Sequence, residues 1–190
     1  ANAVDNVAPT FTAVRTALNT IVLTFSETVN EPAGETTAWT VADAAVGIVP
    51  GVSSGTSMTI TTSGLTATNG TPAVTYIAAN GNLSDASAAT NEMANATTAN
   101  AADQVKPTLT SAKITGANAI TVVYSEPVTS VSGDYTSLVL AAGGARSVTS
   151  VSGSTTATIV LTFDGAAAAA SDTATMTIGA TVKDTSTAQN

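Results

Sequence analysis

The chain has 190 residues, of which 44% are hydrophobic, 4% aromatic and 9% charged, and its net charge is −8. With five scattered Lys and Arg residues it offers no basic face for nucleic acid, and its acidic surface is expected to attract cations instead. The chain has no Cys and no His, which excludes disulfides, zinc–thiolate sites and Ser-His-Asp catalysis, and no apolar run reaches the roughly 18 residues of a membrane span.

Short segments with a two-residue apolar period follow one another along the chain. Ile21, Leu23 and Phe25 alternate with Val22 and Thr24, as expected of a half-buried strand. Turn signals separate this strand from further candidates, and no segment has a helical period. The sequence therefore predicts an all-β protein made of β-sandwiches. The other expected strands are Phe11–Arg15, Ser57–Thr62, Ala73–Ala78, 120–128, Ser137–Ala141, Arg146–Val151, Thr156–Phe163 and Thr173–Gly179.

An internal repeat divides the chain in two. The segment 5–12 matches 103–110 at an offset of 98, and 21–29 matches 120–128 at an offset of 99. We expect the one-residue shift to come from an extra residue near Gly116, in the turn. The repeat predicts two domains, residues 1–100 and 101–190, with small, polar residues 95–102 forming the end of the first domain and its linker.

Three short motifs recur in both copies. Each copy opens with Asp-x-x-x-Pro-Thr, continues to a strand that ends Phe/Tyr-Ser-Glu-x-Val, and closes with a strand that ends in Asp. In these motifs the chain resembles the bacterial and archaeal immunoglobulin-like repeats of S-layer proteins and large surface adhesins. The resemblance implies two tandem immunoglobulin-like β-sandwich domains in an extracellular, array-forming or stalk role. The family follows the closing Asp with Gly-Asn, whereas here Asp85 precedes Ala-Ser-Ala-Ala and Asp184 precedes Thr-Ser-Thr-Ala, so we expect that loop to differ.

The motif acids gather at one pole of each predicted sandwich, because consecutive strands alternate in direction. Three carboxylates with nearby loop carbonyls suit Ca²⁺, which takes six to eight oxygen ligands. The alternative is that each acid caps a turn by accepting backbone N–H bonds. The predicted ligands are Asp5, Glu27 and Asp85 in the first copy and Asp103, Glu126 and Asp184 in the second.

Two further groups of residues are candidate sites. The sequons at Asn69, Asn82 and Asn95 are candidate glycosylation sites in loops of the first copy or near the linker. Glu31 and Glu35 have the composition of a glycosidase carboxylate pair, but the Pro and Gly between them indicate a solvated turn, and Trp39 is expected in a core or interface.

The second copy lacks a counterpart of residues 92–98, which we expect to hold the last strand of the first copy. Either the chain is cut from a longer array whose next residues complete the domain, or a neighbouring subunit donates the strand.

These observations predict a non-catalytic extracellular structural protein of a cell-surface array or stalk, which associates with itself. A surface filament assembled by β-strand donation is one alternative. An adhesin or carbohydrate-binding accessory module is another.

Overall fold

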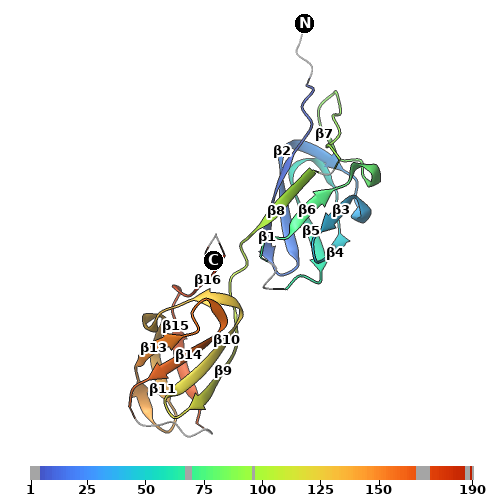
Figure 1. Ribbon diagram of the computed structural model, residues 1–190. Coiled ribbons are helices and arrows are strands. Elements are labelled where there is room, and N and C mark those ends of the chain that lie inside the picture. The colour runs from blue at the N-terminus through green and yellow to red at the C-terminus, as the bar shows by residue number, and fades with distance from the viewer. Residues whose placement is uncertain (1–4, 67–69, 96, 166–171, 187–188, 190) are drawn as a thin grey trace. The chain divides into compact units, whose positions relative to one another are not determined.

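A computed structural model describes residues 5–66, 70–95, 97–165, 172–186 and 189 (Figure 1). The described residues are all-β, with three short 3₁₀ helices, and the chain forms two compact units, Ala1–Val105 and Lys106–Asn190. Within the described residues, no helix combines the length and the apolar character needed to cross a membrane.

The first unit is built from eight strands that pair in the order β3-β6-β8-β1-β2-β5-β4, with β7 pairing to β2. Its elements are β1 (Phe11–Ala17), β2 (Thr20–Glu31), η1 (Thr36–Ala38), β3 (Trp39–Val41), β4 (Ala45–Ile48), β5 (Val52–Ser63), β6 (Ala73–Tyr76), η3 (Ala78–Asn80), β7 (Ser84–Asp85) and β8 (Thr97–Asp103).

The alternation predicted for the central strand is confirmed. Ile21, Leu23 and Phe25 are buried in β2, whereas Val22 is half-buried and Thr24 is exposed. Each fully buried aliphatic side chain of this kind stabilises the fold by about 1.5–3 kcal/mol. The same inward face therefore anchors the core of the unit.

Residues 97–103 are a strand, not the predicted linker, and the last strand of the first copy lies here rather than at 92–98. The first half of β8 pairs antiparallel with β6, and its second half pairs parallel with β1, where Ala101 lies opposite Ala13. Ala101 has no exposed surface. β8 thus closes the gap between β1 and β6 (Figure 1).

The second unit repeats most of this plan. Two sheets are formed, β13-β14-β10-β16 with β9 pairing to β10, and β12-β11-β15. By their partners, β9, β10, β11, β14, β15 and β16 correspond to β1, β2, β3, β5, β6 and β7. Its elements are β9 (Leu109–Gly116), β10 (Ala119–Thr129), η4 (Ser132–Asp134), β11 (Tyr135–Leu140), β12 (Gly144–Arg146), β13 (Val148–Ser152), β14 (Thr156–Phe163), β15 (Ala174–Ile178) and β16 (Lys183–Asp184).

Two local predictions for the second unit need correction. The strand expected over Arg146–Val151 is present as β13, but it begins at Val148, and Arg146 belongs to β12. The extra residue of the second copy is not near Gly116, because the β1–β2 and β9–β10 turns have the same length. It is Thr110, which the register skips between Leu109 and Ser111, whereas β1 pairs with β2 without a break at this point.

Candidate metal site

A reciprocal pair of hydrogen bonds explains the recurring Pro-Thr and Ser-Glu motifs. The Thr10 N–H donates to the Ser26 hydroxyl (3.0 Å), and the Ser26 N–H donates to the Thr10 carbonyl (2.9 Å). Thr108 and Ser125 make the same two bonds in the second unit, at 3.0 and 2.8 Å. We call this reciprocal pair of hydrogen bonds the clasp. It fixes the segment that precedes β1 or β9 against β2 or β10, the strand that carries the motif Glu.

Asp5, Glu27 and Asp85 come together in the first unit, as predicted from strand direction. Glu27 lies where the register of β2 with β5 shifts, and β7 places Asp85 opposite Val29, two residues further along β2. One carboxylate oxygen from each acid lies within 4.8 Å of the other two. Asp85 is buried, Glu27 half-buried and Asp5 exposed.

Asp85 is held by a loop that the sequence motifs did not predict. Its Oδ1 accepts bonds from the Ser87 N–H (3.2 Å), the Ser87 hydroxyl (3.0 Å) and the Asn91 N–H (3.0 Å), and its Oδ2 accepts one from Asn91 Nδ2 (2.7 Å). The Asn91 amide also donates to the Asp5 carbonyl at 3.2 Å. Asn91 therefore links two members of the cluster.

The pKa values of Glu27 and Asp85, the two less exposed acids of the cluster, are shifted in opposite directions. Burial raises the pKa of Glu27, and the charges of Asp5 and Asp85 raise it further. Burial also opposes ionisation of Asp85, but the bonds donated by Asn91 and Ser87 outweigh it and hold the pKa of Asp85 below its usual value. Asp85 is thus a fixed negative charge, while Glu27 faces two like charges that a cation would offset.

Turn capping, the alternative to metal binding, is also present. Asp5 accepts the Val7 N–H at 3.0 Å, and Asp85 caps its own loop as described above. Each oxygen of a carboxylate has about two acceptor sites, so an acid whose oxygen caps a turn can still coordinate a cation. Within the described part of the chain no hydrogen bond to Glu27 is found, so its carboxylate is the member of the cluster that capping does not explain.

The second predicted set is divided between the units. In the second unit, Glu126 and Asp184 are buried on β10 and β16, with carboxylate oxygens within 4.8 Å of each other. Asp184 accepts bonds from the Ser186 N–H (2.9 Å) and hydroxyl (2.7 Å), as Asp85 does from Ser87. Asp103 ends β8 in the first unit, where it accepts the Val105 N–H at 3.0 Å. Its part in a metal site stays a prediction.

The solvated turn predicted around Glu31 is wrong for that residue. Glu31 is 3% exposed, and its Oε1 accepts the Trp39 indole N–H at 2.9 Å. Burial raises the pKa of Glu31 to about 7, with the Trp39 bond opposing the rise and the Glu35 charge adding to it. Glu35 instead accepts the Asn82 N–H (2.9 Å) and Nδ2 (2.7 Å). Trp39 is buried in the core, as is Tyr135 at the matching position.

Glycosylation at the three sequons stays a prediction. Asn82 and Asn95 are both exposed, and the Asn82 amide that would carry a glycan is the one bound to Glu35. The Asn95 amide oxygen accepts the Ala78 N–H at 3.1 Å. Asn69 lies outside the described residues.

No protein-family model matches the chain, and neither does any curated protein. Among solved structures, the chain is similar to the N-terminal part of the bacterial S-layer protein SbsC, with 15% sequence identity and a TM-score of 0.40. The match covers 91% of this chain and 44% of that one, so the present chain spans less than half the length of the S-layer fragment. A likeness of this size does not fix a function.

Proposed function

We propose that the chain is an extracellular, non-catalytic structural protein of a cell-surface array, built from two immunoglobulin-like β-sandwich units. The observation that carries the proposal is the repetition of one strand plan, including the Thr10–Ser26 clasp and its copy at Thr108–Ser125. Serial repetition of one domain suits a building element of a larger assembly.

The burial of the aromatic residues favours this role over a carbohydrate-binding module. All seven aromatic side chains are at most 7% exposed. Trp39 packs between Phe11 and Tyr76, with ring centroids 5.3 and 5.0 Å away. A sugar-binding face uses exposed rings or a concave polar site, and these rings are committed to the core.

Ca²⁺ binding at Asp5, Glu27 and Asp85 is the second part of the proposal. The donors are all carboxylates, the hard oxygen ligands that Ca²⁺ prefers, and the Asp5 loop is tied to Asp85 through Asn91. A bound cation would remove the repulsion that raises the pKa of Glu27. It would also fix the segment that precedes β1.

Calorimetric melting with and without Ca²⁺ tests this part. Ca²⁺ sites of extracellular proteins bind the ion with dissociation constants on the order of 10⁻⁴–10⁻³ M. At a hundredfold excess over that constant, Ca²⁺ should stabilise the first unit by about 2.7 kcal/mol and raise its Tm by roughly 10 °C. Glu27→Gln should abolish the rise without lowering the Tm in chelator, whereas Glu92→Gln, at an exposed acid of the same unit, should keep it. An unchanged Tm in the parent chain would end the metal proposal.

Sedimentation velocity of the full chain tests the structural role. A building element should associate with itself as concentration increases. A chain that stays a single monomer at every concentration, with and without Ca²⁺, would leave the array role without support.

A further inference from the structure

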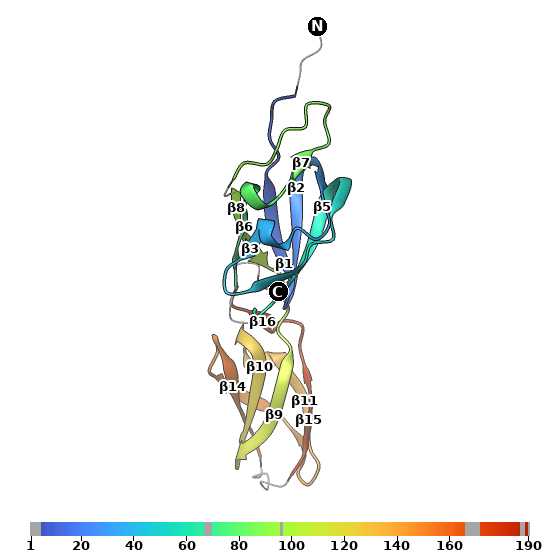
Figure 2. The same ribbon diagram turned by 90° about the vertical axis from the view of Figure 1, so that its right-hand side faces the viewer.

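One strand of the first unit has no equivalent in the second. β8 lies between β1 and β6 (Figure 1), whereas no described strand lies between β9 and β15, their counterparts (Figure 2). Both β9 and β15 therefore have one edge whose backbone groups no described strand pairs. Such an edge is a template for another strand.

β8 covers several side chains of the first unit, and the corresponding side chains of the second unit are more exposed to solvent. Phe11 on β1 is 7% exposed, and its counterpart Leu109 on β9 is 50% exposed. Ala13 is buried, whereas Ala112, which holds the same position opposite β10, is exposed. On the facing strand, Val74 of β6 is fully buried while Met176 of β15 is only half-buried.

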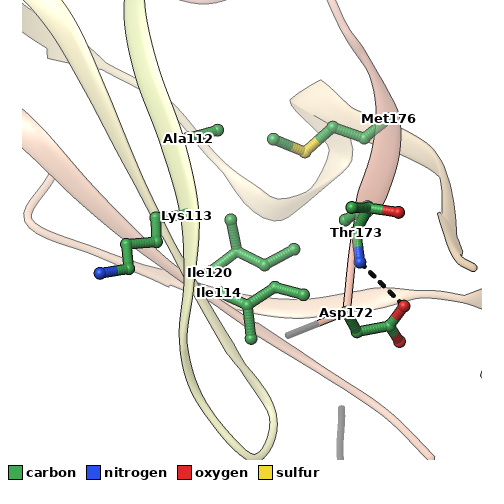
Figure 3. Close-up of a pocket in the computed structure, with 8 residues that line it drawn as sticks. Ala112, Lys113, Ile114, Ile120, Asp172, Thr173 and Met176 are labelled. Carbon is green, nitrogen blue, oxygen red and sulfur yellow. Dashed lines mark hydrogen bonds between the residues drawn. The ribbon is translucent and has the colours of Figure 1, made fainter. Parts of the chain in front are cut away.

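A groove follows the uncovered edge. Figure 3 shows the side chains of Ala112, Ile114 and Ile120 facing Met176 across it, with Lys113 pointing away. The cavity measures about 270 Å³, several times the roughly 30 Å³ that one water molecule occupies in the liquid. A second hollow continues along the same pair of strands beside Leu109 and Ile178. Ile114, Ile120 and Met176 give the first hollow apolar walls, and Asp172 and Thr173 give it polar groups.

The chain contains a second segment with the sequence of β8. Residues 1–10, Ala-Asn-Ala-Val-Asp-Asn-Val-Ala-Pro-Thr, match 99–108, Ala-Asn-Ala-Ala-Asp-Gln-Val-Lys-Pro-Thr, at seven of ten positions. In the first unit, 99–103 is the part of β8 that passes from β6 to β1. Residues 1–5 therefore have the sequence of a strand that completes a unit of this kind and then leads into the next one.

We propose that the groove between β9 and β15 binds residues 1–5 of a second copy of this chain as a parallel strand beside β9. The register follows from β8: Ala101 lies opposite Ala13, so Ala3 of the second copy lies opposite Ala112. Backbone hydrogen bonds supply affinity, and the small Ala side chains fit the shallow floor. Each copy completes the next by the same contact, which produces a linear string. This inference rests on the proposed structural role and specifies the contact through which the copies join.

Disulfide trapping between two different variants tests the contact, because the parent chain has no cysteine. Ala3→Cys chains are mixed with Ala112→Cys chains under mild oxidation and run on a non-reducing gel. Directly opposed residues on paired strands have the Cα separation that a disulfide requires. The matched control replaces Ala112→Cys with Ser111→Cys, at an exposed neighbour whose side chain points to the other face of β9.

We expect a mixed dimer with Ala112→Cys at a yield about tenfold or more above the Ser111→Cys control, and long ladders from the Ala3→Cys/Ala112→Cys double variant. Equal yields from the two acceptor positions would overturn the proposal. So would a double variant that forms only an internally linked monomer, since the strand would then come from the same copy. Concentration-dependent association without the specific mixed dimer would sink this contact while leaving the structural role standing. A specific mixed dimer that forms no larger assembly would support this contact and would leave the proposed structural role without support.

Discussion

Glu31→Gln tests the assignment of a buried carboxyl in the first unit. The wild-type carboxyl belongs to the last residue of β2 and accepts the Trp39 indole N–H, and burial raises its pKa from 4.5 to about 7. Because the folded state binds this proton more tightly than the unfolded state, the stability it contributes is fully present below pH 4.5. That stability is lost as the pH rises through 7.

The size of the effect follows from the two pKa values. A change from 4.5 to about 7 corresponds to an upper limit of roughly 3 kcal/mol. Local relaxation and water penetration reduce the cost of burying a charge, so we expect about 2 kcal/mol for this carboxyl at the end of a strand. The Gln oxygen still accepts the Trp39 N–H, which keeps the packing while removing the titration.

Denaturant unfolding at pH 4.5 and pH 8, followed by fluorescence, measures the difference. Trp39 is the only tryptophan, so its emission reports the first unit alone. Relative to Glu31→Gln, the wild type should lose about 2 kcal/mol between the two pH values. Glu92→Gln, at an exposed acid, should follow the wild type. A Glu31→Gln profile parallel to that of the wild type would refute the assignment.

Two other substitutions test the site loop and the core. Asn91→Ala removes a charge-assisted bond to Asp85, so it should cost about 1.5–3 kcal/mol at pH 7. The depressed pKa of Asp85 gives stability that is present above pH 3.8 and is lost as the pH falls further, so the cost should shrink as the pH falls below 3.8, and a cost independent of pH would contradict the role of Asn91. Leu23→Ala, at a fully buried position, should cost about 2–5 kcal/mol by denaturant unfolding. Thr24→Ala, on the exposed side of the same strand, should stay within about 0.5 kcal/mol, and equal costs would contradict the inward face assigned to β2.

The sequence was sufficient for features that depend on local pattern. The two-residue period of β2 and the recurrence of Pro-Thr and Ser-Glu predicted the central strand and the acids that meet beside it. The alternation of β2 continues through Glu27 to Glu31, which also marked Glu31 as inward-facing. Pro32 and Gly34 predicted a turn here, and Glu31 was assigned to that turn. A strand can, however, continue to the edge of a turn and still bury its last side chain.

Features that depend on distant partners could not be predicted. The residues of β8 are small and polar, as in a linker, and they form a strand because β1 and β6 both offer an edge to them. Asn91 lies six residues beyond Asp85, and only the closed loop joins them. A signal for the nearer contact was present, since Ser87 follows Asp85 as Ser186 follows Asp184.

Electron microscopy of the purified 190-residue chain, with and without Ca²⁺, tests the central claim most directly. The structural role and the β9–β15 contact together predict regular assemblies, either filaments or sheets of aligned filaments. Dispersed single particles under both conditions, at concentrations well above those of the sedimentation experiments, would contradict it.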